Sequence, residues 1–171
     1  AAAIALAAEC ARTTHQSPVV LDACRVYSAM LLCALGGRPA QDWLRAVPEP
    51  VPGCWTARPL RKDVQAVVAT ASVAGDTSVA RGTIDVVQAL ALARRITGDA
   101  QDFDAAIAAA KRSAHDDAAL VAALVGTMIG LQHGMDVLPP ATLGRLAGRA
   151  HLDVAVERSV ARLAATGGVT A

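Results

Sequence analysis

The residues best suited to chemistry stand at the start of one strongly apolar segment. His115, Asp116 and Asp117 directly precede an uncharged run that extends from Ala118 to Gly134. The first turn of a helix carries unpaired N–H groups and a partial positive charge, so carboxylates there either cap the helix or contribute to a site that opens between helices. Capping is the commoner role, whereas a site made of His115, Asp116 and a water would suit zinc or manganese better than magnesium.

The elements that must position these residues are expected to be helices. The chain has 171 residues, of which 54% are apolar and only 2% aromatic, so Ala, Val and Leu must fill the core. Small side chains let helices approach closely, and Ala has the highest helix propensity. No segment shows a convincing two-residue alternation. We therefore predict one all-α domain over residues 1–171, an orthogonal multi-helix bundle that is either complete or part of a larger one.

Apolar spacing and capping signals predict where the helices lie. Ser17 is expected to cap a helix that starts at Pro18 and ends near Leu35. The segment 116–131 has almost no polar face and is expected at the centre of the bundle. The other expected helices span residues 2–12, 39–46, 62–74, 79–96, a segment from about 102 onward, a short one that starts at 139–140, and 151–165.

Charge and cysteine usage exclude some classes of partner. With 16 basic and 15 acidic residues the net charge is +1, which gives no electrostatic reason to expect DNA or RNA. The apolar part of 118–134 is shorter than the about 20 residues that cross a membrane. Without a C-x-x-C spacing, the cysteines are expected to be free thiols rather than zinc ligands. We therefore predict a cytoplasmic protein. The four cysteines are Cys10, Cys24, Cys33 and Cys54.

Two separated blocks of sequence have a recognisable order and spacing. The first block comprises Ala11–Pro18 followed by Asp22-Ala23-Cys24. The second comprises Gly82–Leu90, Asp102–Ile107, Ser113–Gly126 and Gly134–Pro139. They resemble the ADP-ribosylglycohydrolase family, including its dinitrogenase-reductase-activating branch. The first block is similar to the family's S-x-x-T-H-x-x-P…D-A signature, and Ser113–Gly126 to its G-D-T-D-T-x-A-A-I helix start. The resemblance covers about residues 10–146 and corresponds to the C-terminal half of a family member.

The resemblance implies an all-helical enzyme that cleaves ADP-ribose from modified side chains or small acceptors. Two divalent metals, usually magnesium, would lie in a cleft between helices and position the ribose and a water. ADP-ribose or an ADP-ribosylated molecule is the implied partner. His15, in the T-H-x-x-P turn, would lie near the nucleotide, with Gly82 and Thr83 also in the ligand pocket. The alternative for His15 is that Thr14 and His15 only satisfy backbone groups at a helix corner.

The chain departs from the family pattern at the metal positions. Aligned on Ala118, the two family aspartates fall on Ser113 and His115, and the final threonine falls on Asp116. The family's N-terminal motifs G-D-A-x-G and T-D-D-T are absent. No cofactor is therefore expected for this chain, with Mg²⁺ or Mn²⁺ implied only if the family activity is retained. Asp116 and His115 are the remaining candidate metal ligands.

Three interpretations of the function follow. The first is a degenerate or truncated member that acts as a binding or regulatory partner. The second is an active metal-dependent hydrolase seen without its N-terminal half, and the third is a helical structural protein. Because a half-fold exposes an apolar face, we expect a homo- or hetero-oligomer. Trp55 either stacks on a base or covers an edge of the core.

Overall fold

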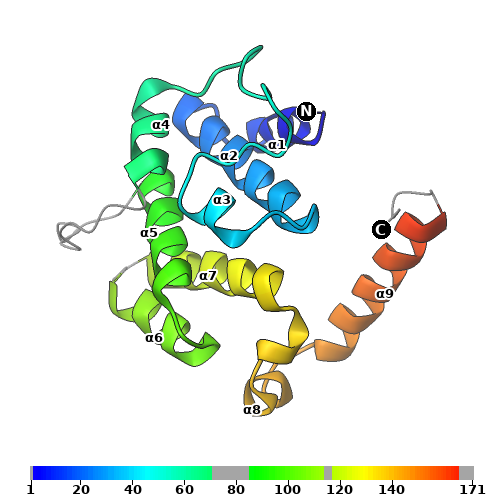
Figure 1. The fold of residues 1–171 in the computed structure, drawn as a ribbon. Helices are drawn as coiled ribbons and strands as arrows, with labels where there is room; N and C mark the ends of the chain where they lie inside the picture. Colours follow the sequence, from blue (N-terminus) through cyan, green and yellow to red (C-terminus); the bar gives the residue numbers. More distant parts are fainter. Residues whose placement is uncertain (1, 71–84, 114–116, 166–171) are drawn as a thin grey trace. The chain divides into compact units, whose positions relative to one another are not determined.

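The computed structural model describes residues 2–70, 85–113 and 117–165, which form α-helices and no β-strand (Figure 1). The prediction of an all-α fold is confirmed. The chain divides into two compact units, Ala1–Val137 and Leu138–Ala171, each of which is described by itself. A single domain over 1–171 stays a prediction.

The described part of the first unit contains seven α-helices and a short 3₁₀ helix. In Figure 1, α1 lies beside α2 at one end of the unit, and α7 crosses α5 rather than running along it. The α6 helix packs on α7. The helices are α1 (Ala2–Arg12), α2 (Pro18–Leu35), α3 (Ala40–Leu44), α4 (Lys62–Ala69), α5 (Val86–Asp99), α6 (Phe103–Ser113) and α7 (Ala118–His133), and the 3₁₀ helix is Met135–Val137.

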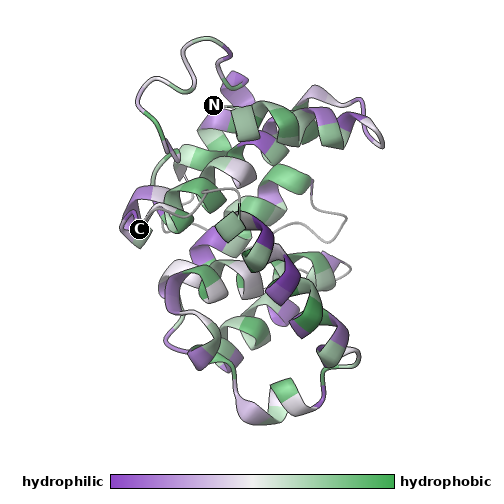
Figure 2. Cartoon of the chain, turned by 90° about the vertical axis from the view of Figure 1, so that its right-hand side faces the viewer, coloured by the Kyte–Doolittle hydropathy of each residue, from purple (hydrophilic) through white to green (hydrophobic). Residues whose placement is uncertain are grey.

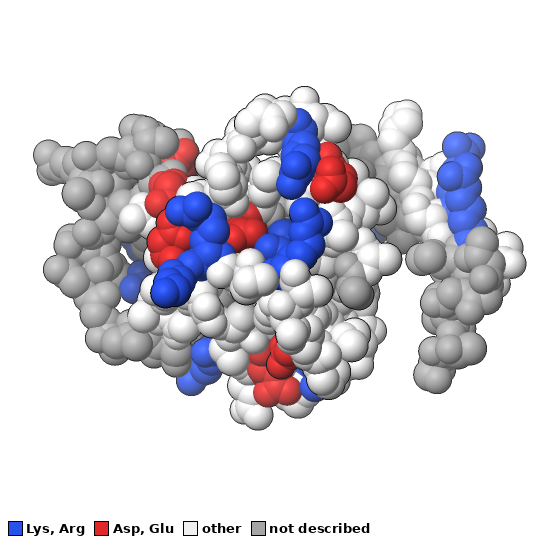
Figure 3. All heavy atoms as spheres, turned by 90° about the horizontal axis from the view of Figure 1, so that it is seen from above, with Lys and Arg blue, Asp and Glu red and all other residues white. Residues whose placement is uncertain are grey.

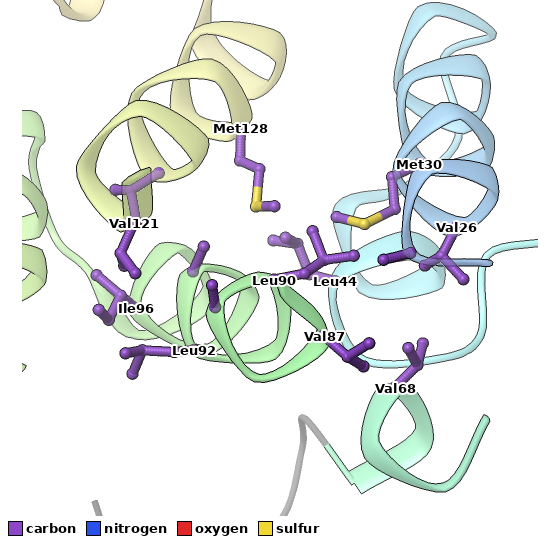
Figure 4. Close-up of a cluster of buried hydrophobic side chains, with 14 of the residues drawn as sticks. Val26, Met30, Leu44, Val68, Val87, Leu90, Leu92, Ile96, Val121 and Met128 are labelled. Carbon is purple, nitrogen blue, oxygen red and sulfur yellow. The ribbon is translucent and has the colours of Figure 1, made fainter. Parts of the chain in front are cut away.

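The core of this unit lies where α2, α5 and α7 converge. Val26 and Met30 of α2 face Leu90 of α5, and Met128 of α7 approaches the same cluster (Figure 4). Four alanines of α5 and α6 are completely buried, and their small side chains allow the close helix contacts that the composition predicts. These alanines are Ala89, Ala93, Ala106 and Ala110.

The start of α5 corrects the expected helix 79–96. Asp85 is its N-cap, because the Asp85 carboxylate accepts hydrogen bonds from the backbone N–H groups of Val87 and Gln88, both at 2.8 Å. The Gln88 side chain in turn accepts from the Asp85 N–H at 3.3 Å. This reciprocal capping box sets the helix start at Val86. The helix then continues to Asp99, three residues past the expected end.

The ends of α2 and the start of α6 agree with the sequence, whereas the end of α4 does not. The α2 helix starts and ends as expected, although Ser17 at its N-cap makes no side-chain capping hydrogen bond. Asp102 caps α6 by accepting from the Ala105 N–H at 2.7 Å. The α4 helix ends at Ala69, five residues before its expected end.

The α7 helix is buried on one side only. Its buried residues include Val121 and Val125, whereas Leu120 is 43% exposed. The expectation that this apolar helix is central therefore holds for one face. The opposite face is apolar and partly open, which matters for the site below.

The second unit presents a different surface. It contains α8 (Pro140–Gly144) and α9 (Arg149–Ala165), and every described side chain of α9 is exposed. Figure 2 shows polar and apolar residues mixed along the helices. Leu152, Val156 and Val160, at helical spacing of four, are all more than half exposed. This unit therefore lacks a buried apolar cluster among its described residues.

Surface charge and helix length bear on the partner predictions. On the face in Figure 3, basic and acidic side chains lie beside one another. Among the described helices, α2 is long and apolar enough to cross a membrane by length and composition, with 44% of its span buried. A core helix passes the same test, and α2 packs against α1, α3, α4, α5 and α7. We therefore interpret α2 as a core helix.

Candidate functional site

An apolar groove of about 490 Å³ opens in the first unit between α1, α2, α5 and α7. Its volume is in the range of small-molecule sites, about 300–1,000 Å³. The partly exposed face of α7 forms one of its walls. The residues lining it are Ala7, Cys10, Ala11, Ala23, Cys24, Tyr27, Ser28, Leu31, Val86, Leu90, Leu120 and Leu124.

The groove can bind an apolar group but offers little for catalysis. No carboxylate or imidazole is among the described residues that line it. Burial raises the pKa of the Cys24 thiol, so this cysteine stays protonated at neutral pH and is a poor nucleophile. Tyr27 supplies an aromatic ring and a hydroxyl, and Ser28 Oγ lies 3.5 Å from the Ala3 carbonyl oxygen.

The structure places one of the predicted ligand residues. His15 is exposed in the turn between α1 and α2, where its Nδ1 lies 3.0 Å from Thr14 Oγ1, and it does not line the groove. Gly82, Thr83, His115 and Asp116 lie outside the described residues. Their roles stay predictions.

The turn that holds His15 closes the C-terminal end of α1. Thr13 Oγ1 donates to the Cys10 carbonyl at 2.7 Å, and Thr14 Oγ1 lies 3.3 Å from the Ala11 carbonyl oxygen. The Gln16 amide donates to the Arg12 carbonyl at 2.9 Å. The Cys10 and Ala11 carbonyls also accept from the backbone N–H groups of Thr13, Thr14 and His15, so the side chains reinforce a turn that the backbone closes. The ligand role and the structural role of Thr14 and His15 both stay predictions.

Asp22, in the first block of family-like sequence, is buried and fully engaged. Its Oδ1 accepts from Arg25 at 2.7 Å, and its Oδ2 accepts from the backbone N–H of Arg61 at 2.8 Å. The pair ties α2 to the residue that precedes α4. Both oxygens thus have a donor, and the carboxylate has a structural role in the described part of the chain.

Arg25 extends the same network to Trp55. The Arg25 guanidinium donates to the Arg58 carbonyl and lies 5.2 Å from the centre of the Trp55 ring, a cation–π contact. Trp55 Nε1 donates to the Pro48 carbonyl at 3.0 Å. One face of the ring is thus covered by Arg25, which favours a packing role over stacking on a base.

Sequence reasoning missed the buried guanidinium of Arg94. This side chain is 0% exposed, donates to the Val68 carbonyl at 2.7 Å and also donates to the Ala46 carbonyl. Burial lowers its pKa to about 10, and no carboxylate pairs with it among the described residues. The available signal was its position, four residues after Leu90 on the apolar side of the helix.

The described residues do not fit a pair of hard cations. Among them, no group of three or more His, Cys, Asp and Glu side chains is arranged to hold a metal. The Asp22 oxygens are occupied, and Ser113, at the end of α6, offers a neutral hydroxyl. Magnesium prefers charged oxygen ligands. We therefore derive no chemical step through a metal.

The comparison with known families covers nearly the whole chain. Residues 1–168 match the model of the ADP-ribosylglycohydrolase family, a wider range than the expected 10–146. No curated protein and no solved structure gave a match. On the strength of the family match, the chain belongs to the ADP-ribosylglycohydrolase family.

Proposed function

We propose that this chain binds ADP-ribose or an ADP-ribosylated molecule and does not hydrolyse it alone. The observation that carries the proposal is the residue pair Ser113 and His115, which stand where the resemblance places two carboxylates. A hydroxyl and an imidazole lack the negative oxygens that hold magnesium. The chain would then be a degenerate member with a binding or regulatory role.

The groove supports the binding half of the proposal. It has room for a flat apolar group, and Tyr27 offers an aromatic ring on which a purine can stack. Val86 follows Thr83 by three positions and Leu120 follows Asp116 by four, so the helices that line the groove begin next to both segments of predicted ligand residues.

Calorimetric titration of the full chain with ADP-ribose tests this proposal. We expect saturable binding that Tyr27→Leu weakens about tenfold, because stacking on an aromatic ring contributes about 1–3 kcal/mol per base. His15→Ala tests the turn, with His151→Ala in α9 as the matched control. Circular dichroism of each variant establishes that it is folded. Absence of saturable binding by the folded wild-type chain would refute the proposal.

The second candidate function is a metal-dependent hydrolase that removes ADP-ribose from proteins or small acceptors. The adjacent carboxylates of Asp116 and Asp117 favour it, and Asp117 occupies the N-cap position of α7. Release of free ADP-ribose from an ADP-ribosylated protein, dependent on Mg²⁺ or Mn²⁺ and lost in Asp116→Asn, would establish this function. That result would replace the non-hydrolytic proposal.

We also propose that the chain associates with a second copy or a homologous protein. The supporting observation is Leu120, an apolar side chain that lines the groove and is 43% exposed. Association through Leu120 and ligand binding in the groove would then compete. Light scattering coupled to size exclusion should show an oligomer that Leu120→Glu weakens and that Leu152→Glu, on α9, leaves unchanged. A clean monomer at all concentrations would exclude association of identical chains.

A further inference from the structure

One side chain belongs both to the apolar groove and to the outer surface of α7. Leu120 lines the groove and is nevertheless 43% exposed. Leu124, one turn further along the helix, continues the groove wall, whereas Ala123 is exposed and is not among the lining residues. Leu120 therefore lies at the edge of the groove, where a bound ligand and a protein that rests on α7 would contact the same atoms.

The exposed side of α7 next to Leu120 can be covered without leaving a polar group unpaired. The Thr127 hydroxyl already donates to the Ala123 carbonyl at 2.9 Å. No charged side chain occurs in the sequence from Ala118 to Gln132, so two copies of this surface can meet without repulsion between like charges. We call this surface the outer strip of α7; its residues are Ala119, Leu120, Ala123 and Thr127.

The groove, in contrast, has no positive charge to hold a phosphate. None of its described lining residues is a lysine, an arginine or a histidine. When the uncharged part of ADP-ribose is in the groove, its negatively charged diphosphate is therefore expected to lie toward the solvent. A second chain on the outer strip would remove water from this diphosphate without pairing it, and two ligands at a symmetric contact would repel each other.

We infer that filling the groove with ADP-ribose, or with the nucleotide of an ADP-ribosylated molecule, separates two associated chains. The inference rests on the proposed function, for the ligand and for the association, and adds the sign of the coupling between them. The coupling is reciprocal, so association weakens ligand binding by the same free energy. The chain thereby converts the presence of an ADP-ribosylated molecule into release of its second copy.

Sedimentation equilibrium of the full chain with and without ADP-ribose measures this coupling. At a ligand concentration about ten times the Kd of the single chain, the dissociation constant of the pair should rise about a hundredfold. The rise is this large because the ligand stabilises each of the separated chains about tenfold. Sodium pyrophosphate at equal ionic strength supplies the charge without the nucleoside and should leave the dissociation constant unchanged.

Three variants separate ligand binding from association. Ala123→Glu places a charge on the outer strip and should weaken association, while the separated chains keep the wild-type affinity for ADP-ribose. Ala105→Glu makes the same change at an exposed position of α6 and should alter neither property. Tyr27→Leu should keep the wild-type association and require about tenfold more ADP-ribose to separate the chains. Circular dichroism establishes that each variant is folded.

The outcomes distinguish this inference from the proposals on which it rests. Saturable binding of ADP-ribose that leaves association unchanged, or strengthens it, would overturn the inference while both proposals stand. Absence of saturable binding, or a monomer at every concentration, would overturn the inference together with the proposal concerned. Separation of the chains by ADP-ribose but not by pyrophosphate, at a higher ligand concentration in Tyr27→Leu, would establish it.

Discussion

Two guanidinium groups are buried in the same unit of this protein, and different partners stabilise them. Arg25 of α2 pairs with the Asp22 carboxylate and lies over the Trp55 ring. Arg94 of α5 is completely buried and donates to the Val68 and Ala46 carbonyls. Each ties a helix to distant backbone, but only the first has a compensating charge among the described residues.

The difference teaches how polar positions of a family-like sequence are used here. Asp22 belongs to the first block of family-like sequence, and its carboxylate accepts hydrogen bonds from an arginine and from a backbone N–H. Arg94 bears the full cost of desolvation, which is visible in its pKa of about 10. Both residues connect segments of the first unit that are distant in sequence.

The largest effect is expected where the charge compensation is removed. Asp22→Ala leaves the Arg25 guanidinium buried without its counterion and removes the acceptor of the Arg61 N–H. Breaking a buried pair in this way costs about 3–5 kcal/mol of unfolding free energy. Urea denaturation followed by circular dichroism measures the loss.

Two controls make this prediction specific. The double variant Asp22→Ala/Arg25→Met should recover part of the stability, since no charge is then left unpaired. Asp63→Asn removes a carboxylate that is 56% exposed and pairs with Arg61 at 2.8 Å, and it should leave stability unchanged within error. A loss as large for Asp63→Asn as for Asp22→Ala would contradict the distinction between buried and exposed pairs.

Arg94 is tested by the dependence of stability on pH. Its folded pKa is about 10, well below that of an arginine in the unfolded chain, so above pH 10 the unfolded chain binds more protons than the folded one. The stability contributed by Arg94 therefore rises with pH above 10, by about 1.4 kcal/mol between about pH 9 and pH 11. The Arg94→Met variant lacks this gain. The wild-type protein and the variant contain the same cysteines, so the contribution of thiol titration cancels when their stabilities are compared. An identical pH dependence of unfolding in both proteins would contradict the lowered pKa.

The sequence was sufficient for the fold class and for elements whose signals are local. Pro18 and the Gly36-Gly37 pair mark the ends of α2, and Asp102 caps α6 three residues from its partner. The start of α5 was misassigned, because apolar spacing that continues before Asp85 masked the pairing of Asp85 with Gln88.

The buried polar ties could not be predicted, because their partners are distant in sequence. The Asp22–Arg61 bond spans 39 residues, and the bonds of Arg94 to Val68 and Ala46 span 26 and 48. Only the folded backbone brings such carbonyls and N–H groups to a side chain. The same holds for the apolar groove, to which four helices contribute.

A smaller effect is expected at a local, exposed cap. Asp85→Ala removes the acceptor of the Val87 and Gln88 N–H groups and should cost about 1 kcal/mol. The loss is smaller than for Asp22 because the freed N–H groups can bind water. Asp85→Asn keeps a capping oxygen and should retain most of the stability. An equal loss in both variants would show that charge, rather than the hydrogen bond, matters.

The smallest effect is expected in the second unit, where apolar side chains are exposed. Val156 is 61% exposed in α9, so Val156→Ala removes little buried area and replaces a β-branched residue with a better helix former. The unfolding free energy should change by less than about 0.5 kcal/mol. A loss above about 1 kcal/mol would mean that Val156 is buried in an assembly, because a cavity cost requires surrounding atoms that the second unit alone does not supply. Repeating the measurement at several protein concentrations separates burial in an assembly from burial within one chain, since stability that depends on association rises with concentration.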